Sequence, residues 1–182
     1  SAGAGTDPSW EAASSGAFTF VSSSTASNSA TVDIQSLASG YDYLFAWDGM
    51  RPVTNGADLY IRFEEAAAFQ ADATDYAWNS LGTDDSDSEI EFGSTTTNSW
   101  SNSLTGGGTV NLIILNPAGT DAPKFITGYG SWWNVASTPL PQRANLDGTY
   151  ISNNAAITGG RFLYDSGNIS TGRLIVYRRQ RS

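Results

Sequence analysis

The sequence predicts an all-β fold, an antiparallel β-sandwich of the jelly-roll type. Two neighbouring runs carry the period of a strand with one buried face. In the first, every second residue is aromatic: Tyr41, Tyr43, Phe45 and Trp47. In the second, every second residue is apolar: Leu59, Ile61 and Phe63. Turn-forming residues such as Pro52 and Gly56 lie between them, so we expect a hairpin-like pair at the centre of the fold.

About eight further short segments show β-type composition or alternation, separated by turn signals. They are residues 18–20, 32–37, 76–78, 90–92, 110–115, 125–133, 161–164 and 174–177. The segment 110–115 is apolar at nearly every position, which is typical of a central strand covered on both faces. Between the strands we expect a polar turn at 22–29, a helix-like piece at 65–69 and an acidic loop at 84–88.

The chain has 182 residues, enough for one domain with a substantial core. Residues 1–16 are rich in Gly, Ala and Ser and are expected to form an arm, whereas residues 17–182 form a single jelly-roll domain. Trp10 is the large aromatic residue of this arm. It either packs back on its own domain or contacts a neighbouring subunit.

Composition narrows the possible chemistry. The sequence contains no Cys and no His, which removes Cys-based metal sites and the commonest general base. Its net charge of −9 argues against binding to nucleic acid, and no apolar run is long enough to insert into a membrane. The basic residues Arg178, Arg179 and Arg181 at the C-terminus form either a solvated end, which we favour, or a subunit contact.

Several segments together resemble a jelly-roll module of tailed-bacteriophage virion proteins. They include Pro52-Val53-Thr54-Asn55-Gly56, Ile157-Thr158-Gly159-Gly160-Arg161-Phe162-Leu163-Tyr164 and Gly172-Arg173-Leu174-Ile175-Val176-Tyr177. The resemblance spans roughly residues 17–178 and rests on core aromatics and turn glycines. It implies a homotrimeric virion protein, made in the host cytoplasm and exposed on the particle surface, that contacts other virion proteins. The motifs transfer no active site, and Arg178-Arg179 departs from the small residue usual after the last strand.

Three functions are candidates, and the first two follow from this resemblance. The first is a tail-associated fibre or spike module that binds host-surface glycans. The second is a capsid decoration protein, a cement or head-fibre unit that stabilises or decorates the phage head. The third is a carbohydrate-binding module of a bacterial protein. None of the three is an enzyme, and none needs a cofactor.

Exposed aromatics are the candidate glycan-binding residues. Trp132 and Trp133 are adjacent, so in a strand they face opposite sides and one of them is available to a ligand. Trp100 lies in a Ser- and Asn-rich loop. Aromatic faces beside amides suit sugar rings, although burial in the core or at a subunit interface is the alternative for each.

Carboxylates offer two weaker candidates. Asp85, Asp87 and Glu89 alternate in the acidic segment and are a possible calcium site, against the simpler interpretation of a solvated loop. Adjacent carboxylates such as Glu64 and Glu65 point to opposite faces of a strand, so they do not form a glycosidase pair. The sequence therefore predicts no enzyme.

We predict that the full chain is a trimer and that the N-terminal arm clasps the neighbouring subunit. Light scattering should give a trimer mass at micromolar concentration, and a chain that begins at Gly16 should associate less because it lacks Trp10. A stable monomer of the full chain would contradict this expectation.

Overall fold

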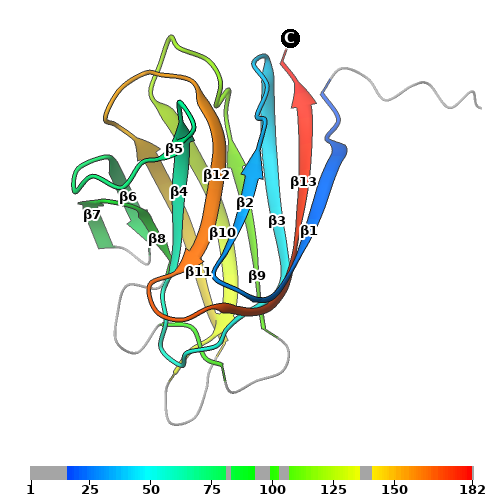
Figure 1. Ribbon diagram of the computed structural model, residues 1–182, viewed down its shortest axis with the longest axis vertical. Coiled ribbons are helices and arrows are strands. Elements are labelled where there is room, and N and C mark those ends of the chain that lie inside the picture. Colours follow the sequence, from blue (N-terminus) through cyan, green and yellow to red (C-terminus); the bar gives the residue numbers. More distant parts are fainter. Residues whose placement is uncertain (1–15, 81–82, 93–98, 103–106, 136–140, 182) are drawn as a thin grey trace, which may run out of the picture.

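The protein is a sandwich of two antiparallel sheets (Figure 1). The computed structural model describes residues 16–80, 83–92, 99–102, 107–135 and 141–181, and for 80 and 83–87 the backbone only. The eight-stranded sheet contains, in order, β1 (Thr19–Ser29), β13 (Ile169–Gln180), β3 (Tyr41–Pro52), β9 (Gly108–Ile114), β10 (Lys124–Trp133), β11 (Pro141–Tyr150), β6 (Tyr76–Ser80) and β7 (Thr83–Asp87). The five-stranded sheet contains β2 (Thr31–Gln35), β12 (Ile157–Tyr164), β4 (Leu59–Glu65) and β5 (Ala68–Phe69), and β8 (Ile90–Phe92) pairs with β4.

The predicted all-β antiparallel sandwich is confirmed. Every strand pair is antiparallel, and the described ranges contain no helix. Within them, accordingly, no helix is long and apolar enough to cross a membrane. Figure 1 shows β1 and β13 at one side of the sandwich and β6, β7 and β8 at the other.

The predicted hairpin between the two central runs is wrong. β3 pairs with β13 and β9 in the larger sheet, whereas β4 pairs with β12, β5 and β8 in the smaller one. The chain crosses from one sheet to the other between them. Each strand has one apolar face, and in opposite sheets these faces meet across the core instead of lying side by side. Alternation indicates which face is buried, but it does not identify the partner strand.

Aromatic residues of β3 form the centre of the core, as their alternation predicted. Tyr43, Phe45 and Trp47 are each at most 2% exposed. Phe162 of β12 enters from the other sheet and meets two of these rings edge to face, with centroids 6.0 Å from Phe45 and 5.6 Å from Trp47. The two sheets are thereby held together by aromatic packing.

Three predicted connections are strand or turn instead. The proposed polar turn at 22–29 belongs to β1, because β13 supplies backbone partners along its length and the Ser and Thr side chains stay in solvent. The helix-like piece at 65–69 is the turn between β4 and β5, where Ala66 and Ala67 adopt positive φ angles of 49° and 66°. Most of the acidic segment 84–88 lies in β7, paired with β6.

Two further strand predictions need correction. β9 is central in its sheet, but Ile113 is only half-buried and Leu115, just after it, is 42% exposed, so this segment is not covered on both faces. β11 has no counterpart among the predicted strands. Its alternating apolar positions are few, with Ala144, Leu146 and Tyr150 buried, and polar residues fill the other face.

Trp100 and Trp132 stack inside the sandwich. Their ring centroids lie 5.0 Å apart with an interplanar angle of 6°, and the residues are 1% and 2% exposed. Glycine is needed at position 108, because a Cβ there would collide with the Trp100 ring. The Trp100 amide donates to the Ala57 carbonyl at 2.9 Å, so this stack also fastens a loop to the core.

We predict that Trp132→Ala lowers the free energy of unfolding by about 3–5 kcal/mol, because it leaves a cavity beside Trp100. Trp133→Ala is the matched control, since Trp133 is the next residue and is only half-buried. Urea unfolding of both variants measures the difference. Equal losses in the two variants would contradict the assignment of Trp132 to the core.

Candidate functional site

The outer face of β10 carries two strongly exposed aromatic side chains. Phe125 is 56% exposed and Tyr129 is 50% exposed, and both point away from the core because Ile126 between them is buried. Trp133 lies on the same outer face and is half-buried. Four-residue spacing places successive rings about 13 Å apart along the strand.

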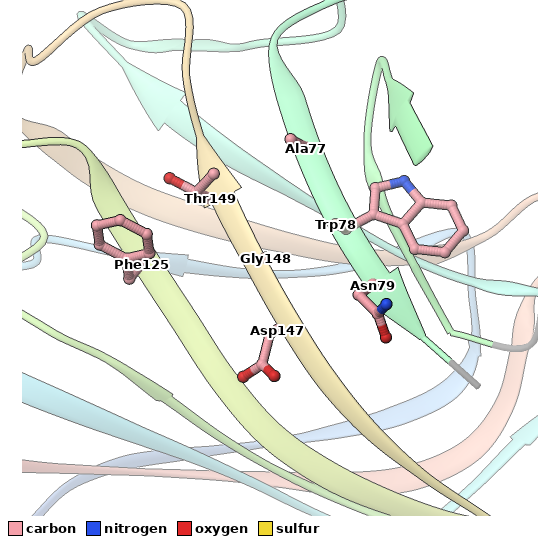
Figure 2. A pocket seen from close by; sticks show the side chains of 7 residues that line it. All are labelled: Ala77, Trp78, Asn79, Phe125, Asp147, Gly148 and Thr149. Atoms are coloured by element: carbon pink, nitrogen blue, oxygen red, sulfur yellow. The ribbon is translucent and has the colours of Figure 1, made fainter. Parts of the chain in front are cut away.

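A hollow lies beside Phe125, across three neighbouring strands (Figure 2). We call it the Asn79 hollow. It is about 310 Å³ in volume, and the side chains around it come from β10, β11 and β6: Phe125, Asp147, Thr149, Ala77 and Asn79. Register explains their proximity, since Thr149 pairs with both Phe125 and Ala77, and Asp147 pairs with Asn79.

The base of the Asn79 hollow is backbone. Gly148 and Trp78 lie in the middle of its lining, but both belong to the core side of the sheet. A Cβ at Gly148 would approach Ile90 to 2.9 Å and Ile126 to 3.2 Å, so its missing side chain makes room inside the core. Figure 2 shows the Trp78 indole pointing away from Phe125 and Asp147. A ligand would therefore lie on a rigid, hydrogen-bonded sheet.

The chemistry of the Asn79 hollow is an aromatic face with polar neighbours. Asp147 accepts a hydrogen bond from the Thr127 hydroxyl at 2.6 Å, which orients its carboxylate on the outer face. Thr149 adds a hydroxyl and Asn79 adds an amide. Apolar contact with a ring plus directional hydrogen bonds is the combination that binds sugars, whose faces are apolar and whose rims carry hydroxyls.

Two of the three tryptophans predicted to bind a ligand are not available to one. Trp100 and Trp132 are buried in the stack described above, so their prediction as exposed glycan platforms is wrong. Sequence reasoning missed Phe125, although the alternation of 125–133 places it on the outward face with Trp133. The sequence gives no sign that these residues form one site, because Asn79 and Asp147 lie far from Phe125 along the chain.

The calcium prediction loses one of its three ligands. Glu89 is 6% exposed, and its carboxylate lies 2.8 Å from the Arg62 guanidinium and 2.6 Å from the Ser88 hydroxyl. This carboxylate is therefore committed to an ion pair. The side chains of Asp85 and Asp87 lie outside the described residues. In the described part of the chain, no group of three or more acidic side chains is arranged to hold a metal ion.

The C-terminal arginines make contacts within the chain. Arg179 donates to Asp42 at 3.0 Å, and the Arg178 guanidinium lies 4.4 Å from the centroid of the Tyr41 ring. Both belong to β13, so the favoured interpretation of a solvated end is wrong for them. Arg181 is exposed and lies 3.7 Å from Asp42. Trp10, the other predicted subunit contact, lies outside the described residues.

A second group of polar residues lies on the opposite face, where Asp58 and Glu91 share a hydrogen bond near Asp165. Burial raises the pKa of Asp58 from 3.8 and that of Glu91 from 4.5, each to about 7. The charge of Asp165 adds to both shifts, whereas the hydrogen bond between the two groups raises the pKa of Glu91 and lowers that of Asp58. Two carboxyls in direct contact share a proton. Glycoside hydrolysis instead needs them about 5 to 9.5 Å apart across a cleft.

Comparisons with known proteins identify no family for this chain. A scan against protein-family models, a search of curated proteins and a search of solved structures each gave no match.

We predict that the acidic pair makes stability depend on pH. Because the folded-state pKa values are raised, the pair's contribution is complete below pH about 4 and is lost as the pH rises to about 7. In Asp58→Asn the free energy of unfolding should vary less over this interval, since the buried group no longer ionises. Urea unfolding across the interval measures this. Asp48→Asn, at an exposed site, should keep the wild-type profile, and an unchanged profile in Asp58→Asn would contradict the prediction.

Proposed function

We propose that this chain is a non-enzymatic structural protein on the surface of a tailed-phage virion, a tail-associated fibre or spike module that binds host-surface glycans. The resemblance of residues 17–178 to phage jelly-roll modules supports the virion assignment. The Asn79 hollow supports the adhesion role. It is the single observation on which the glycan proposal depends.

The Asn79 hollow suits a glycan because its parts are held in place before binding. The Phe125 ring and the polar groups of Asp147 and Thr149 project from paired strands, so little conformational freedom is lost when a sugar binds. A ring face against Phe125 would bury apolar C–H groups, while the carboxylate and hydroxyl accept and donate to the sugar hydroxyls.

Strand order is consistent with the jelly-roll part of the proposal. The chain passes repeatedly between the two sheets, from β1 to β2, from β3 to β4 and from β12 to β13. A jelly roll also places its strands in two packed sheets, eight strands in all. The larger sheet here has eight strands by itself, and three of them, β10, β11 and β6, carry the Asn79 hollow.

The proposal includes a homotrimer assembled with other virion proteins, without cofactor or nucleic acid. In a spike, three copies would present three hollows to one cell surface. Repeated weak sugar contacts then add up to firm attachment.

We predict that Phe125→Ala weakens binding to the preferred glycan roughly tenfold or more, because the variant loses the buried apolar face. A glycan array identifies the ligand, and calorimetry measures its affinity for wild type and variant. Phe20→Ala is the matched control, since Phe20 is 61% exposed on β1 at the far side of the same sheet.

The result that would overturn the adhesion role is equally clear. A wild-type protein that binds no glycan of the array, and that immunogold labelling places on the phage head, would be a capsid decoration protein. Unchanged affinity in Phe125→Ala would place any glycan site elsewhere.

A further inference from the structure

A second hollow lies beside Phe125, which lines it as well as the Asn79 hollow. We call it the Arg181 hollow. It is about 160 Å³ in volume, and its polar lining comes from the β9–β10 connection, the start of β10 and the chain end after β13: Asn116, Asp121, Lys124 and Arg181. One aromatic side chain therefore borders two hollows of different chemistry.

The Arg181 hollow is positive on an acidic protein. Its ionisable groups and their ion-pair partners are three cations, Arg179, Arg181 and Lys124, and two carboxylates, Asp42 and Asp121. The local sum is +3 − 2 = +1, whereas the whole chain carries −9. A bound anion would therefore find attraction here, against the repulsion expected over most of the surface.

Arg181 is held in place by its backbone while its guanidinium remains available. Its amide donates to the Gly40 carbonyl at 3.0 Å, and its side chain is 47% exposed. The contact with Asp42 is long, at 3.7 Å. Asp42 already has closer donors on both oxygens, Arg179 at 3.0 Å on Oδ2 and the Asn116 amide at 3.1 Å on Oδ1. Asp42 therefore does not depend on Arg181.

Lys124 is a buried lysine that lines the same hollow. It is 2% exposed, and its ammonium donates to the carbonyl oxygens of Ala122 at 2.6 Å and Asn154 at 3.4 Å. Burial lowers its pKa, and the charge of Asp121 opposes that shift. A buried cation with only carbonyl partners is further stabilised when an anion approaches.

We propose that the ligand is an acidic saccharide, whose carboxylate binds the guanidinium of Arg181 while an adjoining sugar ring lies against Phe125 and enters the Asn79 hollow. This inference rests on the proposed glycan-binding function. A planar guanidinium pairs with a carboxylate through two parallel N–H donors, which fixes the orientation of the sugar acid as well as its charge. The ligand class is a hexuronate- or sialate-containing oligosaccharide. A neutral sugar would leave the positive hollow without a partner.

The experiment compares matched pairs of oligosaccharides by calorimetry. Each hexuronate- or sialate-containing oligosaccharide is tested beside its carboxyl-reduced counterpart, in which the acid is a primary alcohol. Wild type should prefer the acid roughly tenfold, as expected for a charge-assisted hydrogen bond, and added salt should reduce the preference. Arg181→Gln should bind both members of a pair equally.

Two further variants separate local recognition from general charge and from misfolding. Arg143→Gln removes the same charge from an exposed position further along β11 and should keep the wild-type preference. Arg181→Lys retains the charge without the fork and should lie between wild type and Arg181→Gln. All variants should melt at the wild-type temperature, because Arg181 is not needed to satisfy Asp42.

Each outcome has a distinct meaning. Equal binding of acid and reduced forms by wild type would overturn the acidic ligand but leave glycan binding intact. No binding of either form in any pair would overturn the proposed function itself. An acid preference that survives in Arg181→Gln, or that Arg143→Gln also abolishes, would overturn the role of the Arg181 hollow.

Discussion

Aromatic packing between the two sheets is the interaction on which the rest of the structure depends. Phe162 of the smaller sheet inserts edge-on against Phe45 and Trp47 of the larger one. Burial of such large rings is a dominant favourable term in folding, and their edge-to-face geometry adds specificity. Once β3 presents this face inward, antiparallel pairing carries the same inward face across β13, β9 and β10.

The candidate site is a consequence of that inward face. Ile126 and Trp132 must be buried, and a strand alternates sides, so Phe125 and Tyr129 must point outward. The same register brings Asp147 to its place beside them. The alternation that buries the core residues of β10 thus also places the site residues on the outer surface. These residues are held in place by the paired strands of the sheet.

Charge is organised differently on the two outer faces. On the smaller sheet, Arg161 pairs with Asp33 at 2.6 Å and Arg62 pairs with Glu89 at 2.8 Å, so each cation is matched by a carboxylate. On the larger sheet, one carboxylate among the described residues, Asp42, pairs with both Arg179 and Arg181. Arg181, the more distant of the two cations from Asp42, lines the same hollow as the exposed ring of Phe125. The larger sheet therefore places a positive charge beside an aromatic face.

The sequence by itself determined the all-β class, the buried aromatic face of β3 and the exclusion of His- and Cys-based chemistry, because alternation and composition are local properties. It also showed that Trp132 and Trp133 differ in exposure. It did not reveal that β3 and β4 lie in opposite sheets, that Trp100 stacks inside, or that Asn79, Phe125 and Asp147 share a hollow. Only the tertiary structure decided these points, since strand pairing joins residues distant in the chain and leaves no periodic signal in either partner.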